Sequence, residues 1–123
     1  MNNASGKIGE DYAAQLLAKK GYRVVARNYR SRFGEIDLIA ENKEYIVFVE
    51  VKTRGEHYTV GPLEAVTAGK QKKIIKTALF YLQSNKTTLQ PRFDVIGIVT
   101  AADPFSVLSV EHIENAFLGG GFH

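Results

Sequence analysis

Hydrophobic and polar positions in this chain follow two periods, one typical of strands and one typical of helices. Two runs rich in β-branched and aromatic residues, 34–40 and 45–51, flank a polar segment at 41–44 and predict a β-hairpin. Alternation predicts further strands at 22–29 and 93–99. A first helix, ending at Gly21, is predicted by an apolar stripe made of Ile8, Tyr12, Ala13, Leu16 and Leu17.

The second half of the chain carries signals for one more helix and for a less regular end. Pro62 is expected to begin a helix that Gly69 splits, with an apolar stripe over 74–82 beyond it. After Asp103 we expect an edge strand at 105–110, a short helix near 111–117 and a frayed tail at 118–123. This order of elements predicts one α/β domain over residues 1–123.

Four charged residues lie among the apolar residues of the predicted hairpin. Alternation places Glu35 and Asp37 on one face of its first strand, and Glu50 and Lys52 on one face of its second. The predicted turn then sets Asp37 across from Glu50, and Glu35 across from Lys52. Because unpaired charges are expensive to bury, these groups must pair, remain hydrated or hold an ion.

Two explanations of this charged face remain open. Alternation places Ile36 and Leu38 together on the other face, so the charged face can be exposed to solvent, with Glu35 and Lys52 as an ion pair. Such a cross-strand pair contributes ~0.2–1 kcal/mol. The apolar run 45–51 instead predicts a central strand covered on both faces. That position favours the second explanation, a divalent metal with a nucleophilic water.

The spacing of these residues also resembles a known family. Asp37 followed by Glu50-Val51-Lys52 resembles the signature of the PD-(D/E)xK nucleases, in which Glu-x-Lys stands on the strand after the Asp. The longer match, over 34–39 and 48–54, is similar to the bacterial YraN family of endonuclease-like proteins. The likeness extends over most of the chain, and one difference is that Ile36 rather than proline precedes Asp37. It implies a restriction-endonuclease-like core, a mixed β-sheet flanked by helices on both sides.

The resemblance implies metal-dependent hydrolysis of nucleic-acid phosphodiesters, with DNA as the expected polymer. Oxygen ligands favour Mg²⁺ or Mn²⁺ over zinc. The implied metal ligands are Asp37, Glu50, the main-chain carbonyl of Val51 and Glu10. From the sequence alone, Glu10 is better explained as a surface carboxylate in the first turn of its helix.

The resemblance also assigns a catalytic lysine. Lys52 would position the attacking water and stabilise its hydroxide form, in a catalytic set with Asp37 and Glu50. Glu35 would be either a partner of Lys52 behind the metal ligands or an accessory ligand.

Composition limits the other classes of function. The 123 residues are 45% hydrophobic and contain no cysteine, which excludes a disulfide framework, a zinc–thiolate site and a thiol nucleophile. No apolar run approaches ~20 residues and no signal-peptide core follows Met1, so a cytoplasmic protein is expected. The glycines at 6–9 lack the spacing of a phosphate-binding loop, which disfavours a nucleotide triphosphatase.

The net charge of +3 permits binding of nucleic acid, and the basic residues form two clusters. We expect phosphate contacts from Arg30, Arg32, Arg54, Lys70 and Lys73. Two alternatives to a nuclease stay open, a nucleic-acid-binding module without catalysis and a protein-interaction adaptor. A homodimer is suggested by fold analogy with Holliday-junction resolvases.

The remaining ionisable residues suggest no second site. Asp94 and Arg92 share a face of the predicted strand 93–99 and its flank, where a salt bridge is expected. Phe33 is one of the aromatic residues near the basic clusters that could stack on a base. His57, in the loop after Lys52, is better explained as incidental than as a substrate contact, and His112 and His123 are not spaced as a metal motif.

Overall fold

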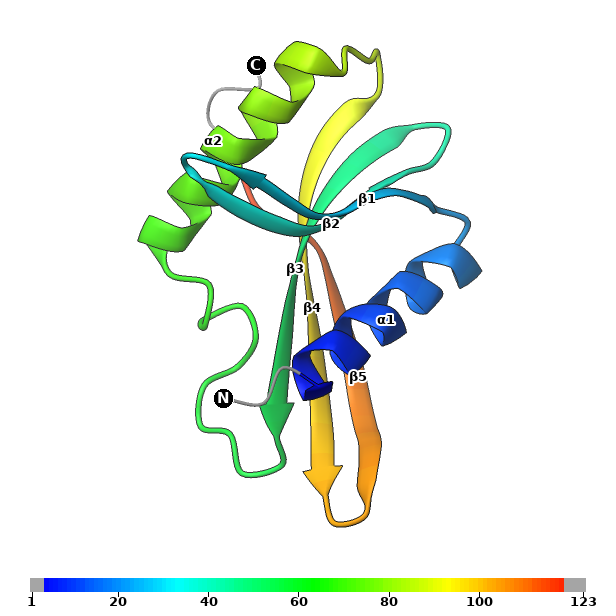
Figure 1. Ribbon diagram of the computed structural model, residues 1–123, viewed down its shortest axis with the longest axis vertical. Helices are drawn as coiled ribbons and strands as arrows, with labels where there is room; N and C mark the ends of the chain where they lie inside the picture. The colour runs from blue at the N-terminus through cyan, green and yellow to red at the C-terminus, as the bar shows by residue number, and fades with distance from the viewer. Residues whose placement is uncertain (1–3, 119–123) are drawn as a thin grey trace.

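The computed structural model describes residues 4–118 and consists of one β-sheet with a helix on each face (Figure 1). The elements in chain order are α1 (Ala4–Lys19), β1 (Arg23–Ser31), β2 (Gly34–Glu41), β3 (Tyr45–Gly55), α2 (Ala68–Ser84), β4 (Gln90–Ala102) and β5 (Phe105–Phe117). No helix in this described part is long and apolar enough to cross a membrane.

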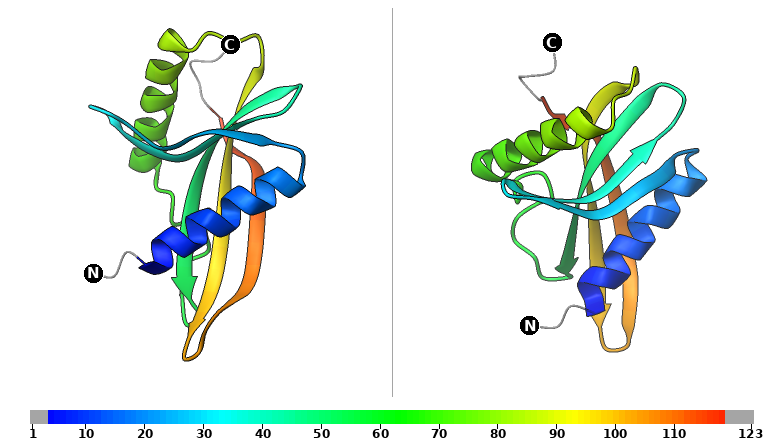
Figure 2. Two further views of the ribbon diagram at one scale, coloured as in Figure 1. Left: turned by 45° about the vertical axis from the view of Figure 1, so that its right-hand side comes forward. Right: turned by 45° about the horizontal axis from the view of Figure 1, so that its top comes forward.

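The sheet is mixed, as the sequence predicted. Its strand order is β1-β2-β3-β4-β5, and the neighbours are antiparallel except for β3 and β4, which are parallel and joined through α2. The central strand β3 is buried from Ile46 to Glu50, which confirms that it is covered on both faces. The β1–β2 hairpin crosses the long strands β3, β4 and β5 at a large angle (Figure 2).

Helix α1 contacts the sheet along a line of mostly small residues. Gly9, Ala13 and Leu17, each four residues apart, are buried, whereas Ile8 and Tyr12 are exposed. The prediction that Ile8 and Tyr12 face the core was therefore wrong, because small residues let the helix approach the strands most closely along their own line. The helix ends as predicted at Gly21, whose φ is +92°.

Helix α2 begins later than the sequence suggested. Thr67 is its N-cap, and the Thr67 hydroxyl accepts a hydrogen bond from the backbone N–H of Lys70 at 3.2 Å. Pro62 lies in a turn before the helix, and Gly69 lies in its first turn and does not split it. Ile74 and Ala78 are buried as predicted.

The C-terminal part of the chain differs most from the prediction. Residues 105–117 form one long strand, β5, so the helix expected near 111–117 was wrong. The backbone of this segment pairs with β4, with Ile113 opposite Val95 and His112 opposite Ile96. Pairing with an open sheet edge outweighs the weak local helical pattern. Of the tail predicted at 118–123, residues 119–123 lie outside the described part.

Candidate functional site

The candidate site lies where two neighbouring strands separate. Strands β2 and β3 pair in antiparallel register, and Leu38 opposite Val49 is the last pair of their ladder. Asp37 and Glu50 are the next residue on each strand, just beyond the paired part, whereas β3 remains paired with β4 as far as Gly55 and Thr100. Beyond Leu38, β2 therefore leaves β3 and opens a groove between them.

A change of backbone conformation accompanies this separation. Asn28 on β1 has a left-handed φ of +51° and lies between the pairs Arg27–Leu38 and Tyr29–Ile36, opposite Asp37. A left-handed residue interrupts the regular alternation of a strand. Ile36 packs in the core under α2, whereas Leu38 packs in the core under α1. The prediction that Ile36 and Leu38 share one face was therefore wrong.

The groove between the separated strands has a volume of about 640 Å³ and gathers residues from four elements. Helix α1 contributes Glu10, β2 contributes Asp37, and β3 contributes Val51 and Lys52. The remaining lining residues are Gly6, Lys7, Asn28, Arg30, Glu35, Thr53 and Arg54. Of the predicted metal ligands, the groove brings together Glu10, Asp37 and Val51.

Asp37 is an uncompensated acid at the base of this groove. Its Oδ2 accepts one hydrogen bond, from the backbone N–H of Val51 at 2.7 Å. Burial and the neighbouring carboxylate of Glu50 raise the pKa of Asp37 to about 7, although the Val51 hydrogen bond acts in the opposite direction. Two carboxylates that disfavour each other's charge form an environment in which a cation would be stabilising.

Glu50 lies next to this acid but is held by lysines. It is 5% exposed, and its Oε2 lies 3.5 Å from Lys52 Nζ and 3.2 Å from Lys70 Nζ. Glu50 and Lys52 thus share a face of β3, as predicted. Lys70 was predicted to contact phosphate, but the structure directs its ammonium group to Glu50.

Glu35 has a different partner from the one expected. Its Oε2 accepts a hydrogen bond from Arg30 Nε at 2.8 Å, whereas Lys52 pairs with Glu50. The predicted pairing of Glu35 with Lys52 was wrong because β2 has already left β3 at this point. Glu35 still lines the groove, so its role as an accessory ligand stays a prediction.

Glu10 reaches the groove because α1 and β3 approach each other closely. A Cβ at Gly9 would collide with the Thr53 hydroxyl, so only glycine lets the helix lie at this separation. The Oε1 of Glu10 accepts hydrogen bonds from Arg27 Nη2 at 3.0 Å and from Asn28 Nδ2 at 3.1 Å. Its carboxylate is therefore already engaged on one side.

These contacts separate the acids from one another. Within residues 4–118, no three His, Asp or Glu side chains are arranged as a site for a metal ion. Asp37 and Glu50 form a pair, whereas Glu10 and Glu35 are each turned toward an arginine. Two adjacent carboxylates and a main-chain oxygen make up the hard donor set in reach, which suits Mg²⁺ or Mn²⁺.

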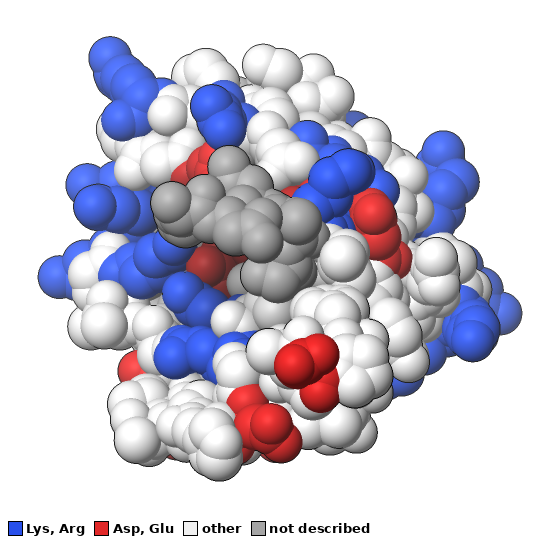
Figure 3. All heavy atoms as spheres, turned by 60° about the horizontal axis from the view of Figure 1, so that its bottom comes forward, with Lys and Arg blue, Asp and Glu red and all other residues white. Residues whose placement is uncertain are grey.

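The basic residues surround the groove on several sides. Arg30 and Arg54 line it directly, and Arg30 also lines a neighbouring depression of about 430 Å³ together with Lys70 and Lys73. Arg32 lies further along, with its guanidinium carbon 5.0 Å from the centre of the Phe33 ring. Figure 3 shows Lys and Arg side chains on both sides of one face of the molecule, with acidic side chains between them.

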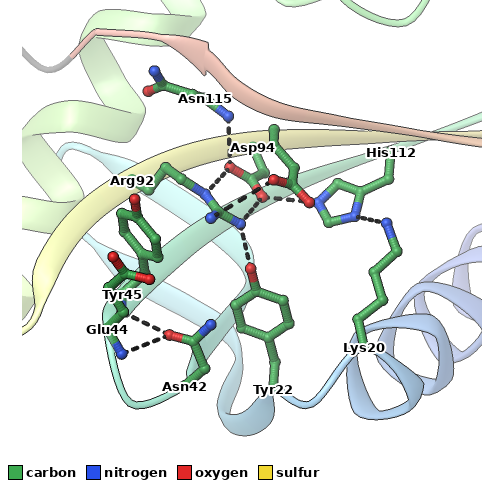
Figure 4. A network of polar contacts seen from close by, with 10 residues as sticks. Lys20, Tyr22, Asn42, Glu44, Tyr45, Arg92, Asp94, His112 and Asn115 are labelled. Atoms are coloured by element: carbon green, nitrogen blue, oxygen red, sulfur yellow. Dashed lines mark hydrogen bonds and ion pairs between the residues drawn. The ribbon is translucent and has the colours of Figure 1, made fainter.

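A second polar cluster, here called the Asp94 network, lies away from the groove (Figure 4). Arg92 Nε and Nη2 donate to the two carboxylate oxygens of Asp94 at 2.9 and 2.8 Å, which confirms the predicted salt bridge. Arg92 Nη2 also donates to the Tyr22 hydroxyl, and His112 Nε2 lies 2.8 Å from Asp94 Oδ2. The sequence pattern carried no signal for His112, because its partner is 18 residues away on another strand.

Hydrogen bonds decide the charge state of Asp94. Burial alone would raise its pKa, but hydrogen bonds from His112, Arg92 and the backbone N–H of Asn115 lower the pKa below its usual value. Within the described residues, no buried side-chain nitrogen or oxygen lacks a hydrogen-bond partner. The Asp94 network is thus a satisfied structural cluster.

Comparison with known proteins identifies relatives over nearly the whole chain. A family model described as Uncharacterised protein family UPF0102 matches residues 9–98. A UPF0102 protein of Caldanaerobacter subterraneus subsp. tengcongensis is 48% identical over 113 residues, which cover 91% of this chain and 93% of that protein. A UPF0102 protein of Rhodococcus jostii is 44% identical over 117 residues, which cover 94% of this chain and 98% of that protein. These matches confirm the predicted family, and the names of these relatives state no activity.

Proposed function

The chain belongs to the uncharacterised protein family UPF0102, and from this premise we propose that it is a divalent-metal-dependent nuclease that hydrolyses phosphodiester bonds, with DNA as the expected substrate. One observation carries the proposal. Asp37 and Glu50 are adjacent carboxylates at the point where two strands separate, with Lys52 beside them in an open groove. Such a cluster does not stabilise the fold in an evident way, because the charge of Asp37 is offset by one backbone hydrogen bond and opposed by the neighbouring Glu50.

The donor set fits a hard divalent cation. Asp37 and Glu50 would hold Mg²⁺ or Mn²⁺, joined by the main-chain carbonyl of Val51 and by Glu10. The raised pKa of Asp37 supports this assignment, because burial and the nearby Glu50 disfavour its ionised form and a cation would favour it. When bound, the ion would lower the pKa of a coordinated water and offset charge on the phosphoryl oxygens.

Other side chains of the groove would position the attacking water and bind the phosphates of the substrate. Lys52 is partly exposed and its ammonium group lies 3.5 Å from Glu50 Oε2, so it can reach both the acid pair and a water in the groove. Its positive charge would hold the attacking water and stabilise the hydroxide. Arg54 and Lys73 would bind the phosphates that flank the cleaved bond. Arg30 would bind a phosphate through the guanidinium N–H groups that do not donate to Glu35.

A cleavage assay tests this proposal directly. Linear, nicked, branched and single-stranded DNA are incubated with Mn²⁺ or Mg²⁺, using wild type, Lys52→Ala and the matched control Lys43→Ala. Lys43 lies exposed in the β2–β3 turn, away from the groove. We expect Lys52→Ala to reduce the cleavage rate by ~10²–10⁴-fold and Lys43→Ala to have no effect. If purified Lys52→Ala cuts as fast as wild type, the nuclease assignment of this hairpin is wrong.

A binding module without catalysis is the second candidate, and one observation favours it. Both Lys52 and Lys70 approach the Glu50 carboxylate, where they compete with a metal ion. A protein of this kind would bind DNA with a log–log salt slope of ~−0.9 per contacted phosphate and cut nothing. Binding that is insensitive to salt would instead favour the protein-interaction adaptor.

A further inference from the structure

A second groove lies on the outer side of the β1–β2 turn, against the exposed face of α2. It has a volume of about 350 Å³. Its lining, here called the Phe33–Phe80 groove, consists of Arg32, Phe33, Lys76, Leu79, Phe80 and Gln83. None of these side chains is acidic, so the groove combines apolar surface with positive charge.

The apolar part of this groove is exposed to solvent. Phe80 is 42% exposed and Leu79 is 37% exposed, although the sequence stripe placed Leu79 in the core. Two cations lie over the Phe33 ring, with the Arg32 guanidinium carbon 5.0 Å and Lys76 Nζ 5.9 Å from its centre. These two cations would sit beside any planar group that stacks in the groove.

The groove is held in shape by contacts between the turn and the helix. Ser31 Oγ and Thr77 Oγ1 are 3.1 Å apart, and Thr77 Oγ1 also donates to the Lys73 carbonyl at 2.8 Å. Gly34 has a φ of +155°, and a Cβ there would lie 3.3 Å from the Cβ of Lys73. A larger residue at 34 would push the turn away from α2, so the close approach depends on glycine.

A basic path connects this groove to the acid pair. The depression lined by Arg30, Lys70 and Lys73 lies on the same turn and helix, and Arg30 and Glu35 line both that depression and the candidate site. A phosphate chain could therefore cross Arg30 and Lys73 while its bases reach the Phe33–Phe80 groove.

We propose that the Phe33–Phe80 groove binds an unpaired base, so that the substrate is DNA with a single-stranded segment next to the bond that is cut. The inference rests on the proposed nuclease function and names its substrate class. Aromatic side chains stack on the faces of unpaired bases, whereas the bases of an intact duplex are already stacked on one another. Arg32 and Lys76 supply the complementary charge for the adjoining phosphates.

Charge also decides against a second copy of this chain as the occupant. In a twofold contact the same surface lies on both partners. Arg32 and Lys76 of the two copies would then face one another, and like charges across an interface are unfavourable. An anionic strand meets the same cations favourably.

The experiment compares two DNAs in metal-free buffer, where no cleavage occurs. A duplex with a single-stranded overhang and the same duplex with blunt ends are titrated with wild type, Phe80→Leu and Phe33→Leu, and binding is followed by fluorescence anisotropy. The matched control is Phe105→Leu, which changes a phenylalanine of 43% exposure on β5. Leucine keeps apolar bulk and removes the ring, so folding should be preserved.

We expect each groove variant to bind the overhang DNA about tenfold more weakly than wild type and to bind the blunt duplex unchanged. Phe105→Leu should match wild type on both. In addition, a photoreactive halogenated pyrimidine placed in the overhang should cross-link to Phe33 or Phe80, as mapped by mass spectrometry.

Several results would overturn the inference. These are equal loss on both DNAs, no loss in either variant, or a cross-link mapped elsewhere. A wild-type dimer that Phe80→Leu dissociates would assign the groove to self-association instead. The comparison of wild type with Lys52→Ala tests the nuclease proposal separately. If wild type cuts blunt and overhang DNA at the same rate, this inference is wrong while the nuclease proposal stands.

Discussion

Two aspartates on strands of one sheet, the half-buried Asp37 and the buried Asp94, have opposite electrostatic environments. Asp94 on β4 receives hydrogen bonds from an arginine, a histidine and a backbone N–H, and its pKa is lowered. Asp37 on β2 receives one backbone hydrogen bond and lies beside Glu50, and its pKa rises to about 7. Burial raises the pKa of both carboxyl groups, and the neighbours of each decide whether the net shift is upward, as for Asp37, or downward, as for Asp94.

This contrast separates a structural acid from a functional candidate. Buried charges that only stabilise the fold are paired and hydrogen-bonded, because burying an unpaired charge costs several kcal/mol of free energy, ~3–5 kcal/mol when a pair is broken. A carboxylate with few stabilising neighbours is typical of a functional site, where a bound cation or substrate supplies the missing interaction. Each of the following predictions tests whether Asp37 and Asp94 differ in this way.

The largest expected difference concerns catalysis. We expect Asp37→Asn to lower the DNA cleavage rate by at least ~10²-fold, because it removes the charge of a carboxylate that we propose as a metal ligand and leaves the volume of the side chain nearly unchanged. Glu44→Gln, in the exposed β2–β3 turn, is the matched control and should cut at the wild-type rate. Rates are measured on folded protein with Mn²⁺ in excess. Equal cleavage by Asp37→Asn and wild type would remove the distinction between the two aspartates.

The next largest difference concerns stability. Asp94→Asn removes the carboxylate that lies 2.8 Å from the buried guanidinium of Arg92 and leaves it with the Glu114 carboxylate at 3.8 Å. Breaking a buried ion pair in this way typically costs ~3–5 kcal/mol of unfolding free energy. Urea denaturation measures this loss, with Asp103→Asn in the exposed β4–β5 turn as control. Asp37→Asn should lower the unfolding free energy little or not at all. If Asp37→Asn is as destabilising as Asp94→Asn, then Asp37 is a structural acid too.

Cation binding should stabilise the protein only while Asp37 and Glu50 keep their carboxylates. A ligand present at one hundred times its dissociation constant adds about 2.7 kcal/mol to the unfolding free energy. We expect Mn²⁺ to raise the melting temperature of wild type and of Asp94→Asn by similar amounts. The Asp37→Asn, Glu50→Gln double variant should show no such rise. A shift that persists in the double variant would place the cation elsewhere.

The pH dependence of stability should have opposite signs for the two aspartates. The folded pKa of Asp94 is lowered, so its carboxylate stabilises the protein above pH ~3.9, and this stabilisation is lost as the pH falls through the folded pKa. The stability gap between wild type and Asp94→Asn should therefore narrow in acid.

For Asp37 the folded pKa is raised to about 7, so the folded protein retains a proton that the unfolded chain releases. In metal-free buffer, wild type should lose stability relative to Asp37→Asn as the pH rises toward 7. Denaturation curves over a pH series check both signs. If the difference in unfolding free energy from wild type changes with pH in the same direction for Asp37→Asn and Asp94→Asn, the two aspartates do not differ as proposed.

Relations between residues near each other in the chain could be predicted from the sequence. The hairpin turn, the shared face of Glu50 and Lys52, the helix end at Gly21 and the Arg92–Asp94 salt bridge all follow from short periods and local conformational preferences. Glu50 and Lys52 lie on one face of the strand whatever surrounds it, since side chains two residues apart point the same way. The sequence alone therefore indicates where the candidate site around Asp37, Glu50 and Lys52 lies.

Partners that are distant in the chain were decided only by the tertiary structure. Lys70 meets Glu50 because α2 packs on the sheet against β2, the neighbour of β3. Glu35 meets Arg30 because β2 leaves β3 before it reaches residue 35. Residues 111–117 became a strand because β4 offered an unpaired edge, which also brought His112 to Asp94. The amino-acid sequence by itself determined which residues share a strand face, because that depends on backbone geometry alone. Which charges meet across elements depends on how those elements pack, and only the folded structure decides that.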